Sequence, residues 1–597
     1  MMLTAARLGD LFLRRFNFHS RLERAIYTIT LGLGIAGFIL FWLGLVGFLY
    51  REVIVVATIT GAVFTVVSFL RSHQGRWRES WQAWEADCCP RGILGWLVLC
   101  LVFGYWLLLL LLTQYPPMNW DATMYHLVLS RQYLTDHQIT VQTGVVFPVL
   151  PILNHLLFSW ALALQDDVLA QMLEHLFLVF TALGLYAWGK RKGRVGIGIL
   201  AAAFWLSHPL VLWLSESAYV DLGITCFALL GITALRNFHD EGRSEWWHLG
   251  LALLALAAGI KISGLVFLGI GTWYGLWAGW RSRLHWRHLT QGWVVAGCLA
   301  IPWYAFIAWH TGNPFWPTFS PFSRGEWADG SVARLLSAFT SAGVPKTPLN
   351  FFLVPFYLIF KPLPFMPDNV LTFFPLLIVW PLAWILAWRE ASIRWWSLWG
   401  LGFTLFWFGS SQQMRLWVPA LPLVGLAICE SFAWVFARIC RRKMVVQLVG
   451  VIFIGVALAF SGVWMLSRLR ARGNLPVNAQ ARESYLAMNW QNYRALQFVN
   501  EHANSQDAVS VINASWLCYY FKPRVVDSAG LLQLRVPPVF KWPEDQRWLN
   551  SLEGQNVKWI FINREPPFNN ISQEIWPEYK LVYSDAHSLV FHHQAGR

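Results

Sequence analysis

The sequence predicts a polytopic α-helical membrane protein with about thirteen transmembrane helices and a small C-terminal α/β domain. Three observations support this prediction. Of the 597 residues, 56% are hydrophobic and 13% are charged, which is about half the charged fraction of an ordinary soluble protein. Apolar runs of roughly 20 residues, the length that a helix needs to cross a bilayer, recur along most of the chain. The runs are continuous, which favours helices over the alternating strands of a membrane barrel.

Thirteen apolar runs are expected to span the membrane. They are residues 26–49, 53–70, 93–113, 168–189, 195–214, 219–236, 246–261, 263–280, 292–310, 370–388, 395–411, 416–437 and 445–466. Two further apolar stretches, 146–164 and 350–366, contain prolines. Counting either stretch alone as a span would move a downstream cluster of basic residues to the other side of the membrane. We therefore expect both to be interfacial or re-entrant helices on the outer face.

The net charge of +14 is explained by the membrane topology. With the N-terminus in the cytoplasm, most Lys and Arg residues outside the apolar runs fall in cytoplasmic segments, as the positive-inside rule requires. This orientation predicts a multi-pass protein of the cytoplasmic (inner) membrane, in contact with membrane lipids. No nucleic-acid partner is needed to explain the basic composition.

The composition divides the chain into three regions. Residues 1–92 hold an N-terminal cytoplasmic segment and two additional spans. Residues 93–466 form the main membrane domain, with long outer-face loops at 114–167 and 311–369. Residues 470–597 are richer in polar residues and predict an extracytoplasmic α/β domain. Its predicted elements are a helix at 481–503, strands at 508–512, 557–563, 579–584 and 588–593, and a helix near 543–553. No GxGxxG follows the first strand, so nucleotide binding is unsupported.

Asp121 is the first candidate for chemistry. It lies in the segment NWDATMYHL (residues 119–127), directly after the predicted span 93–113. An ionised carboxylate at the membrane surface can take a proton from an acceptor hydroxyl as a general base. The alternative is that Asp121 is the N-cap of the probable helix that follows. Tyr125 and His126 in the same segment are further site candidates.

Two acids lie together in SESAYVD (residues 215–221), between the fifth and sixth spans. Glu216 and Asp221 could orient an acceptor, assist Asp121 or hold a divalent cation. The alternative is structural, with Asp221 capping the sixth span and Glu216 exposed to solvent. No metal ligand set and no other cofactor is predicted.

Two cations lie on the same expected face, against the positive-inside trend. Lys261 occurs in GIKISGL and Arg415 in MRLWVPALP. Both residue types bind anionic groups such as phosphate. The alternative for each is an interfacial anchor whose charge reaches the headgroups. Glu174, near the outer end of the fourth span, could pair with Lys261 or Arg415 and so account for either cation structurally.

Together, acids that activate a nucleophile and cations that neutralise a leaving phosphate fit transfer of a group from a lipid phosphate to an acceptor hydroxyl. A transporter or flippase for a polyprenyl-linked substrate is the alternative from another class. Transporters tend to show internal repeats and broken helices at the membrane midplane, and neither is evident in the sequence. A catalytically inactive assembly protein is the second alternative.

At these residues the chain resembles the GT-C superfamily of membrane glycosyltransferases, on the side of the protein O-mannosyltransferases and the lipid A aminoarabinose transferases. The resemblance covers roughly residues 93–466 and rests on an ordered set of weak motifs. They are Asp121 in NWDATMYHL, Asp221 in AYVDLG, Lys261 in GIKISGL, the TGNPFWP loop, and Arg415 in MRLWVPALP.

The resemblance implies an inverting glycosyltransferase that uses a polyprenyl-phosphate-linked sugar donor and a lipid, glycan or protein acceptor. It implies that Asp121 is the base and that Lys261 and Arg415 bind the donor phosphate. Asp221, with Glu216, takes the second acidic position. The chain departs from the protein O-mannosyltransferases at Ala122, where that family usually has a second acid beside the first.

Overall fold

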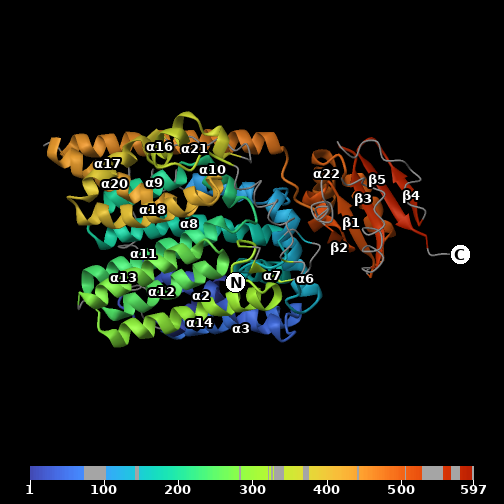
Figure 1. Ribbon diagram of the computed structural model, residues 1–597, viewed down its shortest axis with the longest axis horizontal. Coiled ribbons are helices and arrows are strands. Elements are labelled where there is room, and N and C mark those ends of the chain that lie inside the picture. Colours follow the sequence, from blue (N-terminus) through green and yellow to red (C-terminus); the bar gives the residue numbers. More distant parts are fainter. Residues whose placement is uncertain are drawn as a thin grey trace.

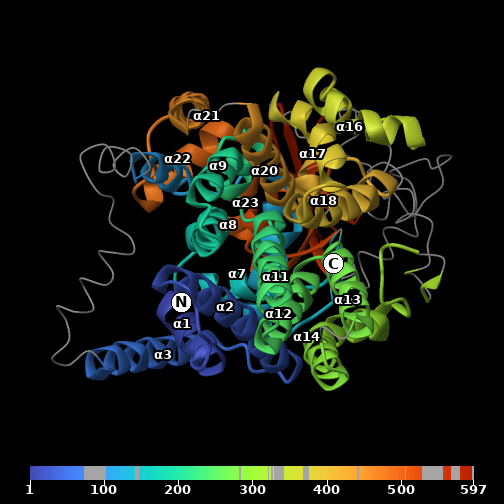
Figure 2. The same ribbon diagram turned by 90° about the vertical axis from the view of Figure 1, so that its left-hand side faces the viewer.

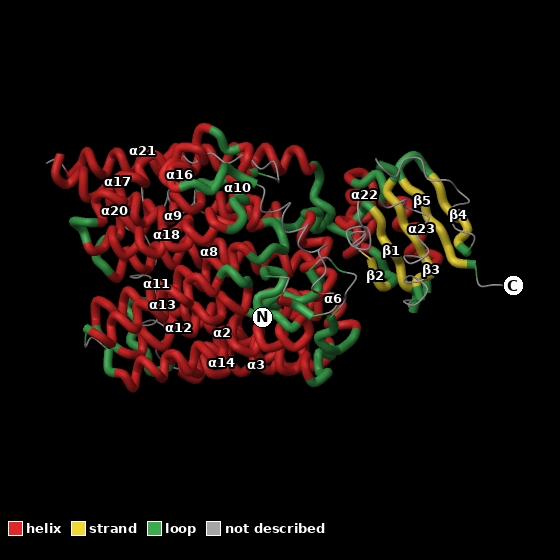
Figure 3. Tube along the Cα trace, in the orientation of Figure 1, coloured by secondary structure: helices red, strands yellow, loops and turns green. Residues whose placement is uncertain are grey.

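The computed structural model describes the chain except for residues 73–102, 142–144, 146, 282–283, 320–321, 325–326, 328–341, 367–374, 440–442, 505, 528–555, 566–577 and 595–597. Helices run side by side in a bundle, and a small sheet domain adjoins one end of it (Figures 1 and 3). We call this end of the bundle, which contains residues 113–127 and 216–221, the domain end. The opposite end, which contains residues 187–195 and 236–245, is the far end.

The bundle is built from eighteen described helices. They are α1 (Met2–Leu13), α2 (Arg21–Leu45), α3 (Arg51–Ser72), α6 (Leu127–Thr135), α7 (Leu153–Leu164), α8 (Asp167–Arg191), α9 (Val195–Leu206), α10 (Pro209–Ser215), α11 (Asp221–Glu241), α12 (Ser244–Ile260), α13 (Gly264–Trp280), α14 (Trp286–Thr311), α16 (Pro348–Phe360), α17 (Trp380–Ala387), α18 (Ala391–Gly409), α19 (Met414–Trp417), α20 (Leu421–Ile439) and α21 (Lys443–Arg472).

The described helices confirm a multi-pass membrane protein. Six helical segments, one of which runs from α19 through α20, are long and apolar enough to cross a membrane, and α9 with α10, bent by 74° at their junction, would make a seventh. The helices α7 and α16 are short, with 12 and 13 residues, and the expectation that 146–164 and 350–366 do not span stays a prediction. The predicted total of thirteen spans stays a prediction, because the first part of span 93–113 and part of 370–388 lie outside the described residues.

Two features of the N-terminal helices were not predicted. The segment 1–25, whose location in the cytoplasm stays a prediction, includes α1, which packs along α2 and α3 (Figure 2). In the same view, α3 is seen from the side whereas most bundle helices are seen closer to their axes, so α3 lies across the bundle.

Local sequence signals explain where the long helices begin and end. Ser20 accepts a hydrogen bond from the backbone N–H of Glu23 at the start of α2, and Asp166 does the same for Leu169 at the start of α8. These are typical N-caps, which satisfy backbone donors that lack a partner within the helix. At the other end, α11 stops at Gly242, whose φ of 70° suits glycine.

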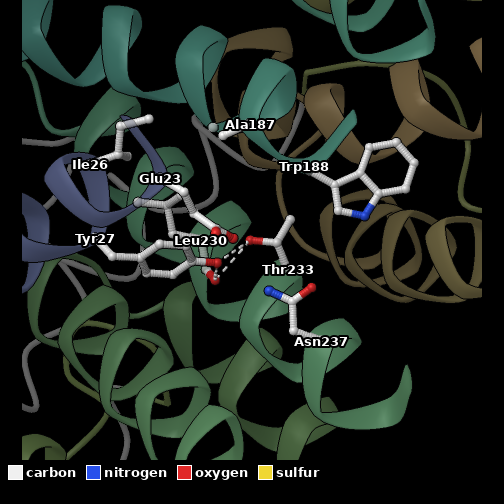
Figure 4. A pocket seen from close by; sticks show the side chains of 9 residues that line it. Glu23, Ile26, Tyr27, Ala187, Trp188, Leu230, Thr233 and Asn237 are labelled. Carbon is white, nitrogen blue, oxygen red and sulfur yellow. Dashed lines mark hydrogen bonds between the residues drawn. The ribbon is translucent and has the colours of Figure 1, made fainter. Parts of the chain in front are cut away.

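A polar cluster joins α2, α8 and α11 at the far end (Figure 4). The Tyr27 hydroxyl donates to the carbonyl of Leu230 over 3.1 Å, and it lies 2.8 Å from the Thr233 hydroxyl. Glu23 pairs with Arg191 over 2.9 Å. The cavity between these side chains has a volume of about 10 Å³, which is room for about one water molecule. The cluster therefore braces the far end and offers no space for a substrate.

The C-terminal domain is a five-stranded mixed sheet with two helices, α22 (Ala479–Asn489) and α23 (Tyr493–His502). The strand order is β2-β1-β3-β5-β4. β1 pairs in parallel with β2 and β3, whereas β5 is antiparallel to both β3 and β4. The strands are β1 (Ala508–Ile512), β2 (Arg524–Asp527), β3 (Val557–Asn563), β4 (Tyr579–Ser584) and β5 (Ser588–His593).

The predicted single helix at 481–503 is wrong, because the chain forms two helices there. Trp490 has an extended backbone, with φ −123° and ψ 113°, and ends α22. The Asn492 side chain then donates to the carbonyl of His587 over 2.9 Å and to the Ser588 hydroxyl over 3.0 Å. The break is thus held by tertiary bonds to the end of the sheet. β2 was not predicted, and the helix expected near 543–553 lies outside the described residues.

The contact between α1 and α2 generates a stability prediction. A Cβ atom on Gly9 would lie 1.8 Å from the carbonyl oxygen of Thr28, and one on Gly32 would lie 1.7 Å from that of Ala5. In an open helix, replacing Gly by Ala gains about 1 kcal/mol. We expect Gly9→Ala and Gly32→Ala instead to lower the midpoint of thermal unfolding in detergent, because overpacking costs about 1–3 kcal/mol. Gly196→Ala in α9, where a Cβ meets nothing within 4 Å, is the control. An unchanged midpoint in the first two variants would contradict the close packing.

Candidate active site

Asp121 lies at the start of a single π-helical turn, η1 (Ala122–His126), at the domain end. Its Oδ2 atom is 2.7 Å from an Nη atom of Arg415 and accepts a 3.2 Å hydrogen bond from the Tyr125 hydroxyl. Turns of this kind are frequent at functional sites. Asp121 occupies the N-cap position of this turn, but its side chain makes no capping hydrogen bond. An ion pair occupies the carboxylate instead.

Arg415 is fixed between a carboxylate and an aromatic ring. It belongs to the four-residue helix α19, and its guanidinium carbon lies 4.9 Å from the ring centroid of Tyr219. The Tyr219 hydroxyl in turn accepts a 3.3 Å hydrogen bond from the backbone N–H of Asp121. Stacking of this kind restricts the planar guanidinium to one orientation. Arg415 is thus a cation of fixed orientation, and its side chain is 12% exposed.

The loop of residues 216–220, between α10 and α11, joins several parts of the site. Glu216 is fully buried and pairs with Arg468 and, over 3.3 Å, with Arg472, both from the end of α21. The next residue, Ser217, accepts a hydrogen bond from the Asn119 side chain. The alternative in which Glu216 is exposed to solvent is therefore wrong. A buried carboxylate needs compensating charge, and two arginines supply it.

Lys261 and Asp221 form a second ion pair in the site. Lys261 follows the last residue of α12 in an extended conformation, and its Nζ atom is 2.7 Å from Oδ1 of Asp221. Asp221 is the first residue of α11, yet its side chain is 3% exposed and caps no backbone N–H. The Lys261 ammonium thus contacts a carboxylate of the protein rather than serving as a simple interfacial anchor.

Glu174 does not pair with Lys261 or Arg415, and this part of the structural hypothesis is wrong. Its two carboxylate oxygens accept hydrogen bonds from the Asn154 side chain over 3.0 Å and from the backbone N–H of Leu222 over 2.9 Å. Glu174, from α8, therefore satisfies a backbone donor in the first turn of α11. This contact fixes the start of α11, and with it the position of Asp221.

Tyr125 and His126 point into buried surroundings beside the Asp121–Arg415 pair. Burial and the nearby Asp121 raise the pKa of Tyr125 well above its usual value, so its hydroxyl stays protonated and donates to Asp121. Burial and the neighbouring His155 lower the pKa of His126 well below its usual value. His126 Nδ1 lies 2.8 Å from His155 Nε2. The histidine is therefore neutral and adds no positive charge beside the pair.

The C-terminal domain contacts the segment that carries Asp121. Its short helix η7 (Ser515–Tyr520) packs against η1. The Tyr520 hydroxyl donates to the carbonyl of Pro117 over 2.9 Å, and Arg131 donates to the carbonyl of Tyr519 over 2.6 Å. The domain therefore holds the chain on both sides of Asp121.

The sequence reasoning missed Arg468 and Arg472, although a signal was present. Both arginines follow the last apolar run on the face predicted to be outside, where basic residues are unexpected. Tyr219, Asn119 and Ser217 are uncharged and carried no such signal. Among the residues that the structure describes, no group of three or more His, Cys, Asp or Glu side chains could hold a metal ion.

No protein-family model matches the chain. The uncharacterized protein SF2093/S2215 of Shigella flexneri is 30% identical to it over 191 residues, which are 32% of this chain and 90% of that protein. The chain therefore belongs to the same family as the Shigella protein.

Two solved structures share the fold. They are crystal structures of ArnT from Cupriavidus metallidurans, one bound to undecaprenyl phosphate and one in the apo state, with TM-scores of 0.54 and 0.53. Both are 14% identical in sequence. They cover 84% and 83% of this chain, and 99% and 98% of ArnT. ArnT, a lipid A aminoarabinose transferase, is a member of the GT-C superfamily. The predicted GT-C fold with a small C-terminal sheet is thus confirmed.

The Lys261–Asp221 pair generates a second stability prediction. We expect Lys261→Met to lower thermal stability in detergent markedly, because breaking a buried ion pair leaves a carboxylate without compensation and costs about 3–5 kcal/mol. The double variant Lys261→Met/Asp221→Asn should recover much of the loss. Lys192→Met removes one of the two basic partners of Asp240, which is 26% exposed and keeps Arg236, and should cost less than about 1 kcal/mol. Equal losses in the two single variants would show that Asp221 does not depend on Lys261.

Proposed function

We propose that this chain, a member of the Shigella protein's family with the GT-C fold, is a membrane glycosyltransferase. It moves a sugar from a polyprenyl-phosphate-linked donor to a hydroxyl group of a lipid, glycan or protein acceptor. The observation that carries the proposal is the Asp121–Arg415 ion pair of 2.7 Å. The Lys261–Asp221 pair lies nearby, because Asp221 follows closely after Tyr219, on whose ring Arg415 stacks. The ArnT crystal structure with undecaprenyl phosphate supports the class of donor.

In this proposal the two cations change partners when the donor binds. Arg415 and Lys261 are each neutralised by one carboxylate in the free protein. A phosphate offers several strong acceptor oxygens, and an arginine can bind two of them at once. When the donor phosphate takes over Arg415, Asp121 is released from its ion pair and becomes available as a base.

The transfer step follows from this exchange. The acceptor oxygen attacks the anomeric carbon of the sugar, the bond from that carbon to the phosphate oxygen breaks, and polyprenyl phosphate leaves. Asp121 takes the proton of the attacking hydroxyl, and the charge that develops on the phosphate is stabilised by Arg415 and Lys261. A single displacement of this kind inverts the configuration at the anomeric carbon.

Asp221 and Glu216, the two acids of the second acidic position, have different roles in this proposal. Asp221 is placed to orient the acceptor once Lys261 turns to the phosphate. Glu216 is engaged by Arg468 and Arg472, so its role is to position the 216–220 loop. We place the domain end outside the cytoplasm of a cell with an inner membrane, and the N-terminus inside, because the Lys and Arg residues favour that orientation.

Asp121→Asn tests the base. We expect at least a hundredfold loss of transfer, because general-base catalysis contributes about 10²- to 10⁴-fold. The measurement is release of undecaprenyl phosphate from radiolabelled lipid-linked sugars, in membranes that contain the protein and its native acceptors. Asp136→Asn is the matched control, since this carboxylate in the same segment bonds to Gln132 and Thr140.

Full transfer by a folded Asp121→Asn protein would remove Asp121 from the mechanism. If wild-type membranes release no undecaprenyl phosphate at all, the protein is not a glycosyltransferase of this kind, and a flippase or an inactive scaffold becomes the better hypothesis.

Arg415→Lys tests the phosphate contact. The substitution keeps the charge but removes the two-pronged guanidinium, so we expect KM for the donor to rise about tenfold with a smaller change in kcat. Arg281→Lys is the control, because Arg281 is exposed and also stacks on an aromatic ring, that of Trp280, at 5.2 Å. Unchanged KM and unchanged kcat in Arg415→Lys would remove Arg415 from the donor site.

A further inference from the structure

Arg468 and Arg472 form, with Glu216, a cluster that carries more positive than negative charge. Each of the other two ion pairs of the site joins one cation to one carboxylate. Here one carboxylate lies between two guanidinium groups. The cluster therefore has a surplus of one positive charge.

The two arginines are held in place but are still reachable. They are four residues apart on α21, so they share one face of the helix. Arg472 donates to the carbonyl of Leu112 over 3.0 Å and lies over the ring of Tyr115 at 5.1 Å. The side chains of Arg468 and Arg472 are 30% and 17% exposed, whereas Glu216 is completely buried. Arg468, the more exposed of the two, is thus the side chain that a ligand can reach, whereas Arg472 is already held by Glu216, Leu112 and Tyr115.

The cluster lies close to Asp121. The 216–220 loop connects them, because Ser217 bonds to Asn119 and Tyr219 bonds to the backbone of Asp121. From Glu216 to Tyr219 the chain spans at most about 11 Å. A lipid phosphate that leaves Arg415 therefore has a second cationic site within a short distance.

We propose that Arg468 and Arg472 form a second phosphate-binding site, which takes the headgroup of the polyprenyl phosphate released after transfer. The inference rests on the proposed function. It assigns the site to a phosphate monoester on an isoprenoid chain. The site lies beside Arg415 and Lys261 and is separate from them.

The test is a titration of the full-length protein in phosphatidylcholine nanodiscs with undecaprenyl phosphate, followed by native mass spectrometry. We expect two bound molecules per wild-type chain. Arg468→Gln and Arg472→Gln should each weaken one of the two by about ten- to hundredfold, the usual effect of losing a charge-assisted hydrogen bond. Arg470→Gln, an exposed arginine between them on a different face of the helix, should bind like wild type.

A second variant separates binding from folding, because removing an arginine also leaves Glu216 less compensated. Glu216→Gln keeps the shape of the side chain and frees both guanidinium groups. We expect it to bind the second undecaprenyl phosphate more tightly than wild type. A purely structural role for the cluster predicts no gain.

Three results would overturn the inference. They are a single bound molecule in wild type, unchanged binding in both Arg→Gln variants, and equal occupancy of the site by phosphatidylglycerol, which would make it a site for bulk lipid headgroups. Each leaves the proposed function standing as long as wild type transfers sugar and Asp121→Asn does not. Failure of wild-type transfer would reject the proposed function itself.

Discussion

Compensation of buried carboxylates at the start of α11 is the constraint on which the arrangement of the domain end depends. Glu216 and Asp221 are almost completely buried, and a buried charge without a partner costs several kcal/mol. Their partners come from the end of α12 and the end of α21. The ends of α12 and α21 must therefore lie beside the start of α11. The GT-C fold meets this demand with helices from widely separated parts of the chain.

In the proposed mechanism, the same ion pairs define the resting state of the site. Asp121 and Arg415 satisfy each other at 2.7 Å, so neither is left as an uncompensated charge in a low-dielectric environment. An anionic ligand must compete with Asp121 for the cation. A substrate without a phosphate would leave the pair intact. In the proposed mechanism, one exchange of partners accounts for both selectivity for a phosphate-bearing substrate and activation of the carboxylate.

Part of this organisation could be predicted from the sequence. Asp121, Asp221, Lys261 and Arg415 were recognisable because charged residues beside long apolar runs are rare and usually have a partner or a task. Which of them pair could not be predicted, because Arg415 lies almost 300 residues after Asp121 and pairing depends on how the helices pack.

The other features that could not be predicted from the sequence depend on tertiary contacts. The break of the predicted helix 481–503 at Trp490 depends on bonds from Asn492 to distant residues of the sheet. The role of Glu174 as a partner for the backbone of α11 depends on the contact between α8 and α11. Tyr219 has no charge to distinguish it from the many aromatic residues of a membrane protein. Helical periodicity reports none of these tertiary contacts.

The contact between Glu216 and the end of α21 also has a consequence for synthesis of the chain. Asp221 meets its partner early, because Lys261 is made 40 residues later. Glu216 must wait until nearly the whole bundle has been translated. Its arginines emerge immediately before the C-terminal domain, whose helix η7 contacts η1. A truncated chain therefore carries an unneutralised acid within its membrane region. Completed and unfinished molecules thus differ in whether Glu216 has its two basic partners.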